Sequence, residues 1–217
     1  MDVRGKIGLA VVVMLALAGA GCSSSKSKSE EPAPNRNVSA GGANGPGIDL
    51  NCVYESIQNP TESFHYSYNK QSSNPVKEEA DITPQTIDGS FTNGGGTQPV
   101  HGTRADQQSW RGALAGLMGI SGMSSTIALV HSGNALKREG NEKMNGYDTT
   151  RYSIDTARGD SAEQGLFRAT LGSGGFEKGD AWVTDKGCPV KIELDTESHN
   201  NDGSVDKIHY SEAMVRK

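Results

Sequence analysis

The chain has 217 residues and carries 21 basic and 26 acidic side chains, for a net charge of −5. Its basic residues nowhere form a run longer than a pair such as Lys137-Arg138. This is too little clustered charge to displace the counterions of a polyphosphate, so nucleic acid is excluded as a partner. Glycine is abundant at 28 residues and aromatic residues make up only 6%, so many turns are expected.

An export signal occupies the beginning of the chain. Two basic residues precede an apolar run over 7–20, which is shorter than the roughly 17 to 25 residues of a membrane-spanning helix. The run ends near Cys22, which resembles the acylated cysteine of bacterial lipoproteins, although Gly19 stands where that family usually has leucine. We therefore predict a signal peptide over 1–21 and a lipid on Cys22. The alternative is an ordinary signal peptide that is cut after Ala20.

The segment 22–47 is predicted to be a disordered tether. It is rich in serine, glycine, proline and asparagine, and Val38 is its one branched apolar residue, so it cannot bury enough apolar surface to fold. The remaining segment, 48–217, is long enough to enclose one core and is predicted to be a single domain. These features predict a protein of the bacterial cell envelope that is anchored to a membrane by its lipid and faces the periplasm or the exterior.

Cysteine usage agrees with export. The chain has three cysteines, and once Cys22 carries lipid, Cys52 and Cys188 remain as an even pair in an oxidising compartment. We expect a disulfide between them, and the alternative is two buried free thiols. A Cys-x-x-Cys pair is absent from the sequence, so catalytic disulfide exchange has no support.

The first elements of the domain are a short helix and a strand. Asp49 is suited to cap a helix that Pro60 ends, and Cys52 lies on this helix. The stretch 62–69 then alternates strictly, which predicts a strand. One face of this strand carries an aromatic stripe of Phe64, Tyr66 and Tyr68. Such a stripe packs in a core more often than it lines a ligand cavity.

The pattern between 76 and 104 is weaker. A strand that includes Ala80 and Ile82 is expected to turn at Asp88-Gly89, because this dipeptide favours a tight hairpin turn. The glycine-rich stretch 92–97 is expected to be a flexible loop, and a further strand is predicted over 100–105.

Helical spacing appears over 106–140. The first predicted helix has one apolar face, formed by Trp110, Ala113, Leu114, Leu117 and Met118. A glycine-rich joint at 119–122 separates it from a second helix that carries Met123, Ile127 and Val130. We expect this helical pair to lie on one face of a sheet.

The last third of the chain predicts antiparallel strands. Asn145-Gly146 is the best two-residue hairpin signal in the sequence, and it separates strands over 142–144 and 147–154. A short helix is expected over 161–171. A meander follows, with strands over 181–184, 189–197 and 205–215.

Few residues suggest chemistry. No histidine has a metal-ligand spacing, so we expect neither a metal nor a cofactor; the five histidines are His65, His101, His131, His199 and His209. The boxes that contain Asp160-Ser161 and Asp206 to His209 resemble the G-D-S and D-x-x-H boxes of SGNH esterases. Ser161 lies late in the chain and in the wrong fold context, so a helix cap explains it better and no catalytic activity is expected.

The order of elements resembles the LolA and LppX/LprG type of envelope lipoprotein carriers. The residue pattern that carries this resemblance is confined to 144–152 and 179–192. The resemblance implies an α+β fold in which a curved antiparallel sheet, an open half-barrel, holds a helical pair on its concave face. It also implies a cavity for a lipid or another apolar ligand. The residues placed to line such a cavity are Phe64, Tyr66, Tyr68, Trp110, Leu114, Leu117, Met118 and Met123. The alternative function is an anchored structural or protein-interaction module with a filled core.

Overall fold

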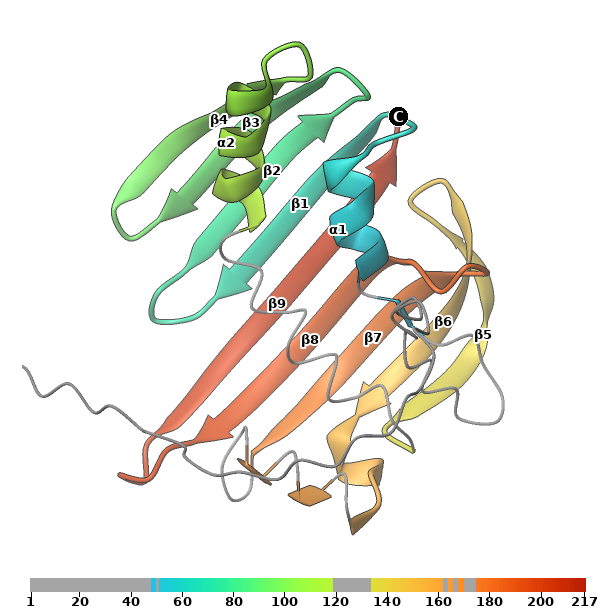
Figure 1. Ribbon diagram of the computed structural model, residues 1–217. Coiled ribbons are helices and arrows are strands. Elements are labelled where there is room, and N and C mark those ends of the chain that lie inside the picture. Colours follow the sequence, from blue (N-terminus) through green and yellow to red (C-terminus); the bar gives the residue numbers. More distant parts are fainter. Residues whose placement is uncertain (1–47, 50, 119–133, 162–163, 166–167, 170–174) are drawn as a thin grey trace, which may run out of the picture. The chain divides into compact units, whose positions relative to one another are not determined.

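The computed structural model describes residues 48–49, 51–118, 134–161, 164–165, 168–169 and 175–217 (Figure 1). The chain divides into two units, Met1–Val38 and Ser39–Lys217, and all described residues belong to the second. Its elements in chain order are α1 (Asn51–Gln58), β1 (Phe64–Gln71), β2 (Val76–Ile82), β3 (Thr86–Asn93), β4 (Gly96–Thr103), α2 (Gln107–Met118), β5 (Leu136–Met144), β6 (Tyr147–Asp155), the 3-10 turn η1 (Thr156–Arg158), β7 (Phe176–Thr184), β8 (Pro189–His199) and β9 (Val205–Arg216).

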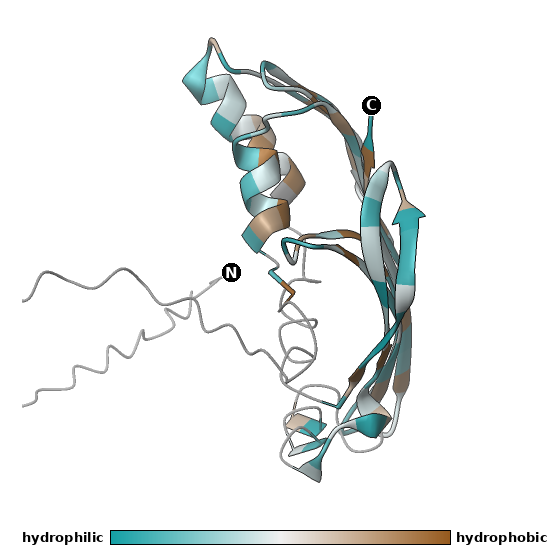
Figure 2. Cartoon of the chain, turned by 90° about the vertical axis from the view of Figure 1, so that its right-hand side faces the viewer, coloured by the Kyte–Doolittle hydropathy of each residue, from teal (hydrophilic) through white to brown (hydrophobic). Residues whose placement is uncertain are grey.

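The strands form one antiparallel sheet in the order β4-β3-β2-β1-β9-β8-β7-β6-β5. The first strand therefore pairs with the last in the middle of the sheet, where Phe64 lies opposite Arg216. We call this pairing the β1–β9 seam, because it joins the β1–β4 half of the sheet to the β5–β9 half. The sheet is curved and open, and the helices lie on its concave side (Figure 2). The expected α+β class with a curved antiparallel sheet is thus observed.

The two faces of the sheet differ because side chains alternate along each strand. Gly102 of β4 lies against Ala113 of α2, which identifies the face on the helix side; we call it the inner face. It holds most of the buried apolar side chains of the strands, including Phe64, Tyr66, Ile82, Ile87, Val100, Ile154, Ala181, Ile192, Leu194 and Met214. The opposite, outer face carries mainly charged and polar side chains.

Helix α2 lies where the first helix of the pair was predicted. The Asp106 carboxylate accepts the N–H groups of Gln108 at 2.9 Å and Ser109 at 3.2 Å, which caps the first turn. Trp110 and Leu117 are buried on its apolar face. The second helix of the expected pair, which carries Met123, Ile127 and Val130, lies outside the described residues. The helical region expected up to residue 140 is wrong at its end, because strand β5 begins at Leu136. In the part of the chain that is described, no helix is long and apolar enough to span a membrane.

The hairpin turn expected at Asp88-Gly89 is wrong. Thr86–Asn93 is one continuous strand, and the turn that precedes it is made at 83–85, where the Thr83 hydroxyl accepts the N–H of Thr86 at 2.9 Å. Gly89 lies in mid-strand. Only glycine fits there, because a Cβ would overlap the carbonyl oxygen of Glu79 on β2. The glycine permits close strand approach and does not make a turn. The expected loop over 92–97 is a tight connection between β3 and β4.

The other hairpins follow the prediction. Asn145 and Gly146 have φ values of 54° and 86°, as the expected tight turn between β5 and β6 requires. β7, β8 and β9 form the expected meander, and β5, β7 and β8 are longer than predicted. Only part of the helix expected over 161–171 lies within the described residues.

Candidate functional site

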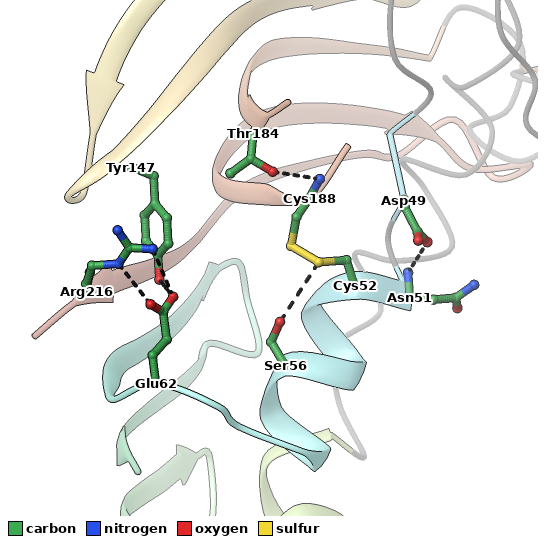
Figure 3. The surroundings of a disulfide bond; sticks show 9 residues. All are labelled: Asp49, Asn51, Cys52, Ser56, Glu62, Tyr147, Thr184, Cys188 and Arg216. Carbon is green, nitrogen blue, oxygen red and sulfur yellow. Dashed lines mark hydrogen bonds and ion pairs between the residues drawn. A yellow bond between two sulfur atoms is a disulfide. The ribbon is translucent and has the colours of Figure 1, made fainter. Parts of the chain in front are cut away.

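Helix α1 is held to the sheet by covalent and polar links (Figure 3). The Asp49 carboxylate accepts the N–H of Asn51 at 3.0 Å at the start of the helix, and the N–H of Asp49 donates to the carbonyl of Gly187 at 2.8 Å. Cys52 forms the expected disulfide with Cys188, which adjoins the turn between β7 and β8. Ile57 of the helix lies in the core at 2% exposure. The helix is therefore fixed at its beginning and along its inner side.

The end of α1 is also fixed. The Arg104 guanidinium, at the end of the β4 hairpin, donates to the carbonyl of Gln58 at 3.1 Å and to the side chain of Asn59 at 3.2 Å. The same guanidinium lies over the Trp110 ring at 4.5 Å from its centre. These contacts link α1 to α2 and to the end of β4, so the last turn of α1 has a defined position.

A cleft with a volume of ≈ 440 Å³ lies beside this helix. Its apolar floor is formed by Phe64 of β1 and Met214 of β9. Polar and charged side chains of α1 and the following loop form the rest of the wall, namely Glu55, Ser56, Gln58, Asn59, Thr61 and Glu62, together with Cys52. The volume lies in the range of ligand sites, but the lining is mostly polar, whereas the pockets of small-molecule ligands are mostly apolar.

One wall of the cleft is held by an ion pair at the end of the β1–β9 seam (Figure 3). The Glu62 carboxylate lies 3.0 Å from Nε of Arg216 and accepts the hydroxyl of Tyr147 at 3.0 Å. Arg216 also stacks on the Tyr147 ring at 4.3 Å. Burial and the neighbouring Glu62 carboxylate raise the pKa of Tyr147. Glu62 is thereby engaged, whereas the exposed carboxylate of Glu55 makes no ion pair or hydrogen bond with the described residues.

The predicted ligand residues that the structure describes lie on β1 and α2. Phe64, Tyr66 and Tyr68 share the inner face of β1, and each is at most 2% exposed. Trp110 and Leu117 are buried and Leu114 is partly buried on α2. Only Phe64 contributes to the cleft beside α1. Met118 is the last residue of α2, and its side chain is not among those described. Met123 and Cys22 lie outside the described residues.

Three carboxyl groups on the inner face, two buried and one half-buried, were missed by the sequence analysis. Glu78 is 0% and Glu177 1% exposed, and Glu212 accepts the hydroxyl of Tyr66 at 3.0 Å. Burial raises the pKa of Glu78 to about 8 and those of Glu177 and Glu212 to about 7, and the nearby Glu212 raises that of Glu78 further. Strand alternation could have indicated the position of Glu78. Glu78 is two residues from Ala80, so both side chains point to the same face of the strand.

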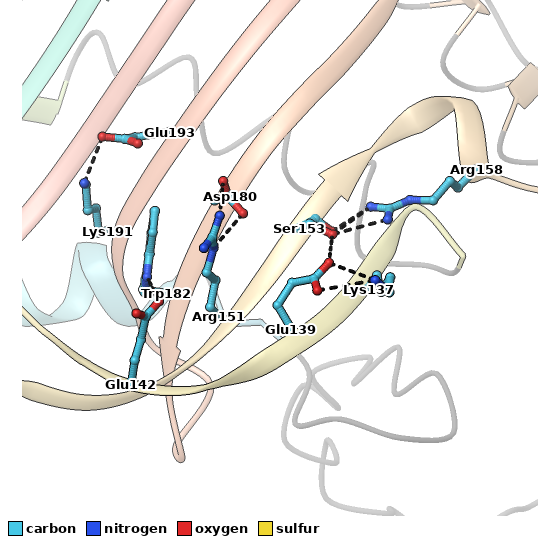
Figure 4. A network of polar contacts seen from close by, with 10 residues as sticks. All are labelled: Lys137, Glu139, Glu142, Arg151, Ser153, Arg158, Asp180, Trp182, Lys191 and Glu193. Carbon is cyan, nitrogen blue, oxygen red and sulfur yellow. Dashed lines mark hydrogen bonds and ion pairs between the residues drawn. The ribbon is translucent and has the colours of Figure 1, made fainter.

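The outer face of β5 to β8 carries a network of polar contacts (Figure 4). Arg151 holds Asp180 with two hydrogen bonds of 2.9 and 3.0 Å. The Trp182 ring is packed between Arg151 and Lys191, and its N–H donates to Glu142. These pairs join β5, β6, β7 and β8, so they stabilise the sheet surface.

The histidines in the described region belong to the same face. His65, His101 and His209 each pair with an aspartate and His199 pairs with Glu197, whereas His131 lies outside the described residues. The partner of His209 is Asp195 at 2.8 Å and not Asp206, and no interaction joins His209 to Ser161 in the described residues. No group of three or more potential metal ligands occurs in those residues either.

Comparisons with known proteins identify no family. No family model and no curated protein matches the chain. Among solved structures, that of MucB in complex with MucA(peri) aligns with 77% of this chain and 55% of its own, at 13% sequence identity and a TM-score of 0.25. The aligned region thus spans about half the length of that structure.

Proposed function

We propose that this chain is a lipid-anchored protein of the bacterial cell envelope that binds a segment of a partner protein in the cleft beside α1, and that it acts by binding and not by catalysis. The apolar run, Cys22 and the tether over 22–47 support the location. The cleft supports the mode of action, and it is the observation on which the proposal rests.

The chemistry of the cleft favours a polypeptide segment with one apolar and one basic side chain. Phe64 and Met214 offer an apolar floor, and the free carboxylate of Glu55 on the rim is suited to a lysine or arginine. The disulfide at Cys52 and the contacts of Arg104 hold α1 in place before binding, which lowers the entropic cost of association.

Site-specific photo-crosslinking in cells tests this function. A photoreactive amino acid in place of Gln58, in the cleft, should give a discrete crosslinked protein, whereas the same group in place of the exposed Gln98 on β4 should not. Thr61→Trp fills the cleft and Glu55→Lys reverses its free charge, so each should abolish the crosslink. The same adducts from positions 58 and 98, or adducts that survive Thr61→Trp, would contradict the proposal.

A second candidate is carriage of a small apolar ligand or lipid, favoured by the same apolar floor. The full burial of Tyr66, Tyr68 and Leu117 supports the filled-core alternative instead, because these residues leave no described space for an acyl chain. Native mass spectrometry of the purified protein distinguishes the two. A co-purifying lipid that is lost in Thr61→Trp would favour carriage.

A further inference from the structure

Two acidic side chains flank one tyrosine across the centre of the sheet. In the observed register, Glu78 of β2 lies directly opposite Tyr68 of β1, which lies directly opposite Glu212 of β9. Directly opposed residues of antiparallel strands point to the same face, so all three lie on the inner face. The row crosses the β1–β9 seam, where the two halves of the sheet are joined.

Neither carboxyl group has a cationic partner in the described structure. Both oxygens of Glu78 are buried without a hydrogen-bond partner, and Glu212 accepts only the neutral hydroxyl of Tyr66. Lys70 follows Tyr68 on the same face but makes no ion pair or hydrogen bond with either glutamate in the described residues. A buried carboxylate without such a partner is costly, and the group neutralises by binding a proton instead.

The neighbours on the flanking strands add no positive charge. Phe91 of β3 lies opposite Glu78, and Ile192 of β8 lies opposite Glu212. The other titratable groups that face the row are Tyr66, Tyr210 of β9 and Glu177 of β7, all neutral or acidic. Ionisation of both glutamates would therefore place two like charges on either side of Tyr68.

We propose that Glu78 and Glu212 form a proton-binding pair that makes the β1–β9 seam sensitive to pH, closed when both are protonated and opening more readily as they ionise. Both pKa values are raised by burial, to about 8 for Glu78 and about 7 for Glu212. The folded domain therefore binds more protons than the unfolded chain between about pH 4.3 and pH 8. The contribution of this pair to the free energy of unfolding is therefore largest at about pH 4.3 and decreases as the pH rises to about 8.

Hydrogen exchange of the intact domain tests the proposal. With intrinsic rates corrected, the opening equilibrium constant at β1 and β9 should rise by on the order of tenfold per pH unit for each proton released between about pH 5.5 and 8. Opening at β5 and β6 should rise less. Glu78→Gln should reduce this slope and Glu78→Gln with Glu212→Gln should remove most of it, because glutamine mimics the protonated acid.

Glu79→Gln is the matched control. Glu79 is adjacent on β2 but points to the outer face, where it pairs with Lys77 at 2.7 Å, so its substitution should leave the slope of the parent. Infrared spectroscopy provides a measurement that does not depend on refolding: the parent at neutral pH should show a protonated carboxyl band that weakens in Glu212→Gln. A parent that opens independently of pH, a slope unchanged in both glutamine variants, or the absence of that band would overturn the proposal.

Discussion

Removal of the disulfide should cost this domain a large part of its stability. Cys52 and Cys188 are 136 positions apart, so the bond closes most of the unfolded domain into one loop. The loop-entropy model gives about 5 kcal/mol for a loop of this length, and measured values are typically about 2–4 kcal/mol. With a urea dependence of about 2 kcal/mol per M, Cys52→Ala with Cys188→Ala should lower the unfolding midpoint by about 1–2 M.

Urea unfolding without reductant, followed by fluorescence of the buried Trp110 and Trp182, measures this loss. Reductant should shift the parent toward the midpoint of the double variant and leave the double variant unchanged. Because the bond acts mainly on the unfolded chain, refolding should slow more than unfolding accelerates. A loss below about 1 kcal/mol, with the disulfide verified in the parent by peptide mapping, would refute the reasoning.

Three further predictions concern the anchor and the core. Cys22→Ser should release the protein from membranes to the soluble fraction, and intact-mass measurement should find acyl chains on the parent alone; an unmodified parent would contradict lipidation. Leu117→Trp should lower the unfolding free energy by about 1–3 kcal/mol because Leu117 is 0% exposed, and a fatty-acid titration of the parent should show no binding; a stable variant of a parent that binds would indicate an open cavity. Gly102→Ala should cost about 1–3 kcal/mol in chemical denaturation because its Cβ would lie 2.7 Å from that of Ala113, whereas Gly112→Ala, with nothing within 4 Å, should gain about 0.5–1 kcal/mol.

The sequence by itself determined the elements whose signals are local. Asn145-Gly146 adopts the positive φ values of a tight hairpin turn, and Asp106 caps α2 through its own carboxylate. The alternation that placed Phe64, Tyr66 and Tyr68 on one face depends only on the two-residue period of a strand. The disulfide was predictable from the parity of the cysteines and the predicted export signal, without knowledge of the fold.

The tertiary structure alone decided the features that depend on strand partners. Gly89 looks like a turn residue locally, but the closeness of Glu79 on the next strand requires a glycine in mid-strand. The pairing of β1 with β9 joins residues that are far apart in the sequence, as in the pair Phe64 and Arg216, and no local pattern encodes it. The cleft beside α1 and the pairing of Glu78 with Glu212 across Tyr68 both follow from that seam. Side-chain periodicity specifies the face of a residue, whereas its neighbours depend on which strands pair and in which register.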